Sequence, residues 1–287
     1  MTKKEKKHGV VLSLSGGLDS STLLLKCINE YENVVALSFD YGQKHKIELQ
    51  KAKDLVHYLN WGSIEDEKFN QIMHQVIKLD GLENLLVSGL MNNGSMNMIK
   101  GHYADETAKS TVVPNRNAIF ASITYAIALS QVKSTGKECD IALGTHMGDF
   151  DNNKKEGIYP DCSEEFRSAL EYAFKIGNWD SDKVNYYAPF NSIDKNEVLK
   201  EGLRLCEELN LNYKEIYSRT MTSYDPKYMD GEWYSDMNSG SSIERIISFI
   251  KAGVPDPLQY VDDNGNKVSW DIVKNNAIKI ENDFRKK

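Results

Sequence analysis

Residues 9–20 read GVVLSLSGGLDS, and this short stretch decides the fold class. The apolar, β-branched run Gly9–Leu14 predicts a buried strand that ends at a glycine turn. From Ser20 to Asn29 the apolar residues recur at helical spacing, so a helix should follow directly. A strand, a glycine-rich turn and a helix in succession form the first half of a parallel α/β unit.

The same alternation continues along the chain. Asn33 to Asp40 (NVVALSFD) predicts a second buried strand, and Lys46 to Leu59 predicts a helix with one apolar face. A strong helical pattern resumes from Ala118 to Gln131, and Asp140 to Leu143 predicts a third strand. Strands that alternate with helices favour a Rossmann-like α/β fold, a parallel sheet with helices on both faces.

The last third of the chain has a different pattern. It is mostly helical from Asp194 to Asn210, irregular from Tyr217 to Ser241, and helical again near Ile243. We therefore expect an α/β domain over residues 1–200 and a mostly helical, partly irregular carboxyl-terminal region, residues 201–287, packed on it.

A polar stretch from Leu90 to Ser110, rich in Asn, Gly, Ser and Met, interrupts the alternation. It is too long for an ordinary connector, which predicts a mobile or functional loop such as a lid.

Composition excludes several classes of protein. With 287 residues, 40% of them hydrophobic and 27% charged, the chain is typical of a soluble globular protein. A net charge of -7 disfavours a nucleic-acid partner, because duplex binding requires the neutralisation of several phosphates. No apolar run reaches the roughly 18 residues that cross a bilayer, and no signal-peptide core is present. We expect a cytoplasmic protein without a membrane partner.

The four cysteines lie far apart, with no C-x-x-C pair and no histidine at ligand spacing. Neither a zinc site nor a disulfide framework is indicated.

The glycine turn has the parts of an anion-binding loop. Gly16 and Gly17 let backbone N–H groups approach a phosphate closely, and Ser15 and Ser20 add hydroxyl donors. Asp19 suits either Mg²⁺ or the orientation of the helix start. The simpler interpretation is a glycine turn with a Ser or Asp helix cap.

This turn resembles the SGGxDS signature of the ATP-pyrophosphatase (PP-loop) enzymes. The resemblance implies cleavage of ATP between its α and β phosphates, an adenylated intermediate and released pyrophosphate. Parallel sheets bind ligands beyond the carboxyl ends of their strands. The segments after Leu14, Phe39 and Leu143 should therefore converge on one site.

Four further motifs resemble QueC, the 7-cyano-7-deazaguanine synthase family, in order and spacing. They are FDYGQKHKIEL from Phe39, VPNRN from Val113, YPDC from Tyr159 and IDK from Ile193. The similarity covers roughly residues 8–260. It implies an ATP-dependent C–N ligase of queuosine biosynthesis that adenylates 7-carboxy-7-deazaguanine, after which an amine attacks to give an amide and then a nitrile.

Carried over residue by residue, the resemblance implies a nucleotide site. Ser38 to Asp40 would line the adenine pocket, Arg116 would face phosphate and Gly144 would permit close backbone approach. Lys195 would neutralise charge that develops on the nucleotide. The implied nucleotide-binding set is Ser15, Gly16, Gly17, Asp19, Ser20, Ser38, Phe39, Asp40, Arg116 and Gly144, and the catalytic set is Asp19, Arg116 and Lys195. A surface ion pair at Arg116 and a solvated helix lysine at Lys195 are the alternatives.

The resemblance also implies that Tyr159, Asp161 and Cys162 line the pocket for the acid. The Asp161 carboxylate can accept two N–H groups from the amino-pyrimidinone edge of a guanine-like ring, or serve only as a turn residue after Pro160. Cys162 equally suits interior packing.

The chain departs from the family near its carboxyl end. QueC enzymes carry four zinc-binding cysteines there, and the alignment places Ser223, Asp236, Ser239 and Ser242 at those positions. Hydroxyls and one carboxylate are poor zinc ligands, so we expect no zinc and a segment that is held in another way.

This departure leaves the product open. Ammonia would give the amide and nitrile, whereas an antiviral-defence relative would join the acid to a protein amine. A non-catalytic nucleotide-binding subunit is a third interpretation. A tRNA-modifying enzyme is disfavoured, since it would need a basic surface and, for thiolation, paired cysteines. Expected partners are ATP, Mg²⁺, a deazapurine carboxylate, ammonia or a protein amine, a second copy of the chain in a homodimer, and a protein encoded in the same operon.

Overall fold

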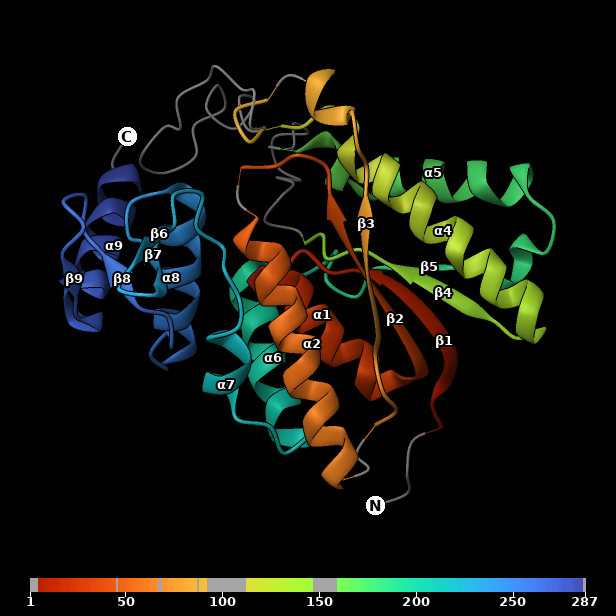
Figure 1. Cartoon of the computed structure of the whole chain (residues 1–287), viewed down its shortest axis with the longest axis horizontal. Coiled ribbons are helices and arrows are strands. Elements are labelled where there is room, and N and C mark those ends of the chain that lie inside the picture. The colour runs from red at the N-terminus through yellow and green to blue at the C-terminus, as the bar shows by residue number, and fades with distance from the viewer. Residues whose placement is uncertain are drawn as a thin grey trace.

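A five-stranded parallel sheet forms the centre of the computed structural model, which describes residues 5–44, 46–66, 69–86, 88–91, 112–146 and 159–285 (Figure 1). The strand order is β3-β2-β1-β4-β5, and every pairing is parallel. The strands are β1 (Lys7–Ser13), β2 (Tyr31–Asp40), β3 (Met73–Lys78), β4 (Cys139–Ala142) and β5 (Tyr186–Tyr187).

Helices cover both faces of this sheet (Figure 1). On one face lie α1 (Leu18–Glu30), α2 (Ile47–Asp66), α6 (Lys195–Glu208) and the short α7 (Tyr213–Tyr217). The other face carries α4 (Arg116–Thr135) and α5 (Glu164–Gly177). The predicted Rossmann-like α/β fold is confirmed.

The carboxyl-terminal region packs beside α6 through α8 (Gly240–Ala252), and α9 (Trp270–Arg285) packs on α8. It also contains a small four-stranded sheet. Its strands are β6 (Lys227–Met229), β7 (Glu232–Asp236), β8 (Tyr260–Val261) and β9 (Lys267–Val268). The prediction that Tyr217 to Ser241 is irregular is therefore wrong, because β6 and β7 lie within it.

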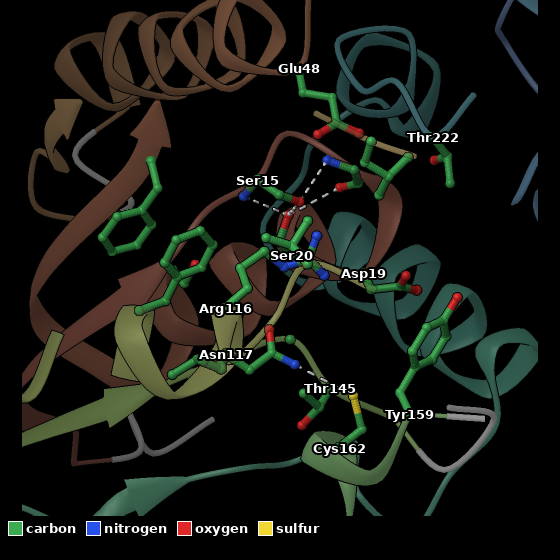
Figure 2. Close-up of a pocket in the computed structure, with 18 of the residues that line it drawn as sticks. Ser15, Asp19, Ser20, Glu48, Arg116, Asn117, Thr145, Tyr159, Cys162 and Thr222 are labelled. Atoms are coloured by element: carbon green, nitrogen blue, oxygen red, sulfur yellow. Dashed lines mark hydrogen bonds between the residues drawn. The ribbon is translucent and has the colours of Figure 1, made fainter. Parts of the chain in front are cut away.

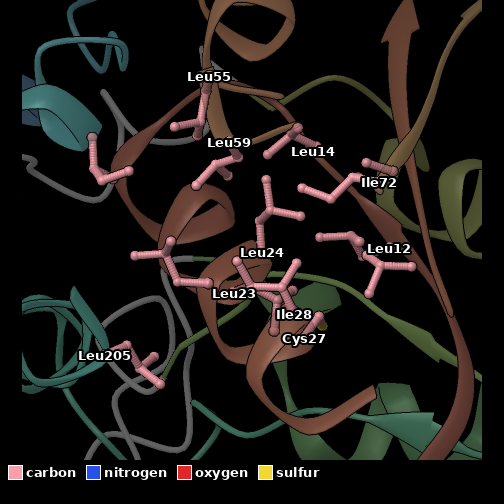
Figure 3. Packing of buried hydrophobic residues seen from close by; sticks show 14 of the residues in the cluster. Leu12, Leu14, Leu23, Leu24, Cys27, Ile28, Leu55, Leu59, Ile72 and Leu205 are labelled. Carbon is pink, nitrogen blue, oxygen red and sulfur yellow. The ribbon is translucent and has the colours of Figure 1, made fainter. Parts of the chain in front are cut away.

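The sheet is buried on both faces, which explains why β1 reads as a continuous apolar run. Side chains alternate along the strand, so Val10 and Leu12 contribute to the core against α1, while Val11 contributes to the core under α4. Leu24 of α1 and Leu55 of α2 belong to the same cluster as Leu12 (Figure 3).

Several elements were not predicted, and their residues explain why. The edge strand β3 reads MHQVIK and is only partly buried. Helix α5 has no buried residue, and β5, β8 and β9 have two residues each. Two-residue strands leave little hydrophobic periodicity in a sequence. Helix α5 is different, because its partly buried residues do recur at helical spacing, and it was nevertheless not predicted. Three turns of 3-10 helix, η1 (Leu82–Asn84), η3 (Pro160–Cys162) and η4 (Ser181–Lys183), link the larger elements.

The predicted functional loop from Leu90 to Ser110 lies outside the described residues, apart from Leu90 and Met91. Within the part of the chain that the structure describes, no helix is both long and apolar enough to cross a bilayer.

Gly202 is required by the close packing of α6 on α1. A Cβ atom at Gly202 would lie 1.8 Å from the Tyr217 hydroxyl oxygen and 3.0 Å from Thr22 Oγ1, two groups that share a hydrogen bond of 2.8 Å. We expect Gly202→Ala to lower the free energy of unfolding by about 1–3 kcal/mol, because overpacking displaces both hydroxyls. Urea denaturation measures this loss.

Gly62→Ala is the matched control, since Gly62 lies within α2 and a Cβ there would meet nothing within 4 Å. That variant should gain up to about 1 kcal/mol from helix propensity. Equal stability of the Gly202→Ala variant and the parent chain would show that this contact is not tight.

Candidate active site

The site lies at the point where the order of the strands reverses. The chain passes from β1 outward to β2 and β3, then returns to β4 on the other side of β1. Ligands of such sheets bind beyond the carboxyl ends of the strands at this switch point. A pocket is found there, and the segments after Leu14, Phe39 and Leu143 meet in it.

This pocket gathers most of the predicted site residues (Figure 2). Those that line it are Ser15, Gly17, Asp19, Ser20, Phe39, Arg116, Gly144, Tyr159, Asp161, Cys162 and Lys195. Further lining residues that sequence reasoning did not single out include Glu48, Phe120, His146, Thr222, Tyr224, Ser241 and Glu244.

The glycine turn brings backbone N–H groups to the pocket. Gly16 has a φ of +90°, and a Cβ there would lie 2.2 Å from the carbonyl oxygen of Glu48, so only glycine fits. Gly17 precedes α1 without any side-chain cap, and the first N–H groups of α1 have no partner within the helix. The turn can therefore offer these N–H groups to an anion.

The two serines of the turn hold its shape. Their hydroxyl oxygens lie 2.9 Å apart, Ser15 Oγ accepts the N–H of Gly17 at 3.2 Å, and Ser20 Oγ accepts the N–H of Ser15 at 3.2 Å. Gly144 packs against this turn, since a Cβ there would lie 3.2 Å from the backbone nitrogen of Ser20. The close approach that was predicted at Gly144 is thus an approach to α1.

Asp19 is the centre of a charged group inside the pocket. Its Oδ2 atom lies 3.4 Å from Lys195 Nζ and 3.8 Å from His146 Nε2, and Lys195 Nζ lies 3.2 Å from Glu244 Oε2. Asp19 Oδ1 is buried and accepts no hydrogen bond from the described residues. Lys195 is the first residue of α6 and is held there because Asp194 caps this helix in a capping box.

Arg116 begins α4, next to Asn115 in the left-handed backbone region at a φ of +57°. Its guanidinium donates to the Tyr41 hydroxyl at 3.4 Å. Burial raises the pKa of Asp161, and the charge of Arg116 opposes that rise. Arg116 therefore lies within the pocket and not at an exposed surface pair.

The pocket has an aromatic wall. Phe39 and Phe120 stack with ring centroids 4.0 Å apart and an angle of 7° between their planes. One turn before Phe120 on α4, the Asn117 amide donates to Cys162 Sγ at 3.7 Å. A flat aromatic pair is a suitable surface for a purine ring.

Three residues of the predicted nucleotide-binding set do not line the pocket: Gly16, Ser38 and Asp40. Ser38 is fully buried and donates to the Leu14 carbonyl oxygen at 2.7 Å, so it ties β2 to β1. Asp40 Oδ2 pairs with Lys46 at 3.2 Å. Of the segment predicted to line an adenine pocket, the structure brings only Phe39 into the lining.

These observations define a class of protein, an α/β protein with a glycine turn and an uncapped helix start at the switch point of its parallel sheet. The sequence matches the family described as "Queuosine biosynthesis protein QueC" over residues 9–234, and the chain belongs to this family.

Among its relatives are proteins named 7-cyano-7-deazaguanine synthase. The one from Marinomonas sp. is 36% identical over 250 residues, which are 87% of this chain and 97% of the relative. A second, from Methanoregula boonei, is 34% identical over 87% of this chain and 98% of the relative. A solved structure of NMN synthetase from Francisella tularensis aligns with a TM-score of 0.38 at 13% identity, covering 95% of this chain and 86% of that chain.

Glu48 lines the pocket near the glycine turn, and burial raises the pKa of its carboxyl from 4.5 to about 8, although the charge of Arg116 opposes the rise. Between pH 4.5 and about 8 the Glu48 carboxyl is therefore protonated in the folded chain and ionised in the unfolded chain. The free energy of unfolding should therefore fall as pH rises from about 5 to 8, by at most about 1.4 kcal/mol per pH unit.

We expect Glu48→Gln to remove this fall, so that the variant gains stability relative to the parent chain as pH rises. Denaturant unfolding at several pH values between about 5 and 8 measures the difference. Glu207→Gln, at an exposed position of α6, is the control and should follow the parent chain. A constant difference across this pH range would contradict the raised pKa.

Proposed function

We propose that this chain uses ATP to adenylate a 7-deazaguanine carboxylic acid, 7-carboxy-7-deazaguanine, and then transfers the acyl group to an amine. Membership of the QueC family and the names of its relatives supply the substrate class. One observation carries the proposal. The uncapped start of α1 opens into the same pocket as Asp19, Arg116 and Lys195.

The proposed reaction consists of two steps, transfer of the adenylyl group to the acid and transfer of the acyl group to the amine. A carboxylate oxygen of the acid attacks the α-phosphorus of ATP, the bond to the bridging oxygen breaks, and pyrophosphate leaves. The amine nitrogen then attacks the acyl carbon, loses a proton, and expels AMP to leave an amide. A nitrile would need a second ATP, since the amide oxygen must itself be adenylated before it leaves.

Several described residues of the pocket have roles suited to this reaction. The N–H groups at the start of α1 would bind the departing pyrophosphate, as helix starts bind anions. Arg116 presents a planar guanidinium suited to phosphate oxygens. Lys195 would oppose charge that develops as the phosphorus is attacked, and the Phe39–Phe120 pair would contact a purine ring.

The charge of the pocket favours a nucleotide that carries a metal ion. Even with Glu48 protonated, three carboxyl-bearing residues of the described wall, Asp19, Asp161 and Glu244, face two fixed cations, Arg116 and Lys195. A free triphosphate would add further negative charge. Mg²⁺ prefers one or two carboxylates together with phosphate oxygens, and the unpartnered Asp19 Oδ1 suits it. Bound there, Mg²⁺ would neutralise charge on the phosphates.

Asp161 remains our candidate for recognition of the amino-pyrimidinone edge. It lies on η3 between Pro160 and Cys162 and lines the same pocket as Tyr159. Ionised, it can accept two N–H groups at once. The loss of the zinc cysteines also supports a second candidate function, a defence-associated ligase whose acceptor is a protein amine.

Asp19→Asn tests the adenylation step. We expect it to slow acid-dependent exchange of pyrophosphate into ATP by about 100-fold or more, because the amide loses the charge that Mg²⁺ and Lys195 need. Asp182→Asn, at an exposed position of η4, should exchange at the parent rate. Undiminished exchange in the Asp19→Asn protein would sink the role assigned to this residue.

Mass spectrometry of the products distinguishes the acceptors. With the acid, ATP, Mg²⁺ and ammonium, we expect the amide or the nitrile to form. A product seen only when a protein with a free amino terminus is added would favour the second candidate function. Absence of both products together with absence of pyrophosphate would leave a non-catalytic nucleotide-binding subunit. Sedimentation of the same protein tests the predicted homodimer.

A further inference from the structure

A buried polar group lies directly behind one wall of the pocket. Ser223, Asp236, Ser239 and Ser242, here named the serine–aspartate cluster, occupy the four positions that the resemblance assigns to zinc-binding cysteines. Asp236, Ser239 and Ser242 follow one another at intervals of three residues, and the fold brings Ser223 to them. Asp236 Oδ2 accepts the hydroxyls of Ser223 at 2.5 Å, Ser239 at 2.7 Å and Ser242 at 2.9 Å.

These residues do not suit zinc. Asp236 Oδ1 accepts two backbone N–H groups, from Asn238 at 2.8 Å and Ser239 at 2.5 Å, so the carboxylate takes part in five hydrogen bonds. The hydroxyl protons point inward to Asp236, and zinc prefers thiolate and imidazole ligands. No group of three His, Cys, Asp or Glu side chains in the described ranges is placed to bind a metal. Hydrogen bonds fill the position instead.

The cluster joins two segments of the pocket wall. Ser223 lies between Thr222 and Tyr224, both of which line the pocket. Ser242 lies in the first turn of α8, and its neighbours Ser241 and Glu244 also line the pocket. Because Asp236 Oδ2 bonds both Ser223 and Ser242, it fixes the start of α8 against residues 222–224.

Arg245 fixes the same two segments from the other side. It is fully buried and forms a bidentate pair with Asp256, at 2.6 and 2.9 Å. It also donates to Thr220 at 2.7 Å and Thr222 at 3.3 Å. Asp236 holds the start of α8 and Arg245 holds its middle. The direction of Glu244, the residue before Arg245, is therefore fixed.

Glu244 reaches across to α6. Its Oε2 atom lies 3.2 Å from Lys195 Nζ, while Asp19 of α1 holds the same ammonium at 3.4 Å. The Lys195 side chain is only 13% exposed, so these contacts are weakly screened by water. Glu244 therefore supports the ammonium from the carboxyl-terminal region, and Asp19 supports it from the glycine turn.

We infer that the serine–aspartate cluster holds α8 in place in this chain as a structural metal ion would. By holding α8 it positions Glu244, and Glu244 in turn positions Lys195. The kinetic part of this inference rests on the proposed adenylation. The structural part does not, because the cluster has to hold α8 whatever the substrate is.

Glu244→Gln tests the positioning role without disturbing the cluster. We expect the kcat of pyrophosphate exchange to fall on the order of 10- to 100-fold while the KM for ATP changes less than about 3-fold, since Lys195 loses its ion pair with α8. Glu244→Asp should recover part of the rate, and Glu207→Gln on the exposed side of α6 should match the parent chain. An unchanged kcat in Glu244→Gln overturns the role of Glu244.

A second readout does not depend on activity. Acetylation of lysines by a dilute reagent, followed by mass spectrometry of peptides, reports how firmly Lys195 is held. Labelling at Lys195 should accelerate several-fold in Glu244→Gln but not in Glu207→Gln. If the parent protein shows no exchange, the proposed function fails, and this labelling still decides whether Glu244 holds Lys195.

Metal analysis and melting test the cluster. The purified protein should contain no stoichiometric zinc and melt at the same temperature with and without a chelator. Asp236→Ala should melt about 5–15 °C lower, because three buried hydroxyls and two N–H groups lose their acceptor. One zinc per parent chain, or an Asp236→Ala protein that melts like the parent, overturns the inference.

Replacement of all four residues by cysteine provides the positive test. The variant S223C/D236C/S239C/S242C should bind one zinc per chain and regain most of the melting temperature that Asp236→Ala loses, and exchange should return with it. Failure of this variant to bind zinc would show that the four positions are not equivalent to a metal site.

Discussion

The parallel pairing of β1 with β2 on one side and with β4 on the other is the constraint on which the rest of this molecule depends. This pairing fixes where the carboxyl end of β1 lies, and therefore where the glycine turn lies. The backbone of the turn packs closely against α2 and against the segment after β4. Gly16 touches the carbonyl oxygen of Glu48, and Gly144 touches the backbone of Ser20. Side chains larger than hydrogen would separate the elements that form the pocket.

The same pairing decides the electrostatics of the pocket. Charged side chains from α1, α6 and α8 are brought within reach of one another, and the lysine at the start of α6 lies between carboxylates of α1 and α8. Burial at this point raises the pKa values of Glu48 and Asp161. With Glu48 protonated, Asp19, Asp161 and Glu244 still line the pocket beside Arg116 and Lys195, so the pocket suits a triphosphate that carries a cation better than a bare one.

In the carboxyl-terminal region, hydrogen bonds hold together the four positions at which the resemblance places zinc-binding cysteines. A buried carboxylate is costly unless hydrogen bonds satisfy it, and Asp236 has five. Arg245 and Asp256 form a second buried network a few residues away. Together the two networks attach α8 to residues 220–224, and so fix the wall of the pocket that these segments form.

The sequence by itself determined the α/β class, the glycine turn after β1 and the family, since apolar periodicity and short ordered motifs are local properties of the chain. It also indicated most of the residues that line the pocket, because motifs at strand ends meet at one edge of a parallel sheet. It did not indicate His146 or Glu244, which lack a local pattern and gain meaning only beside Asp19 and Lys195. Nor did it show that Ser38 turns away into the core, or that three serines donate to one aspartate. Those facts depend on the direction in which each side chain points after the chain has folded, and tertiary packing decides that direction.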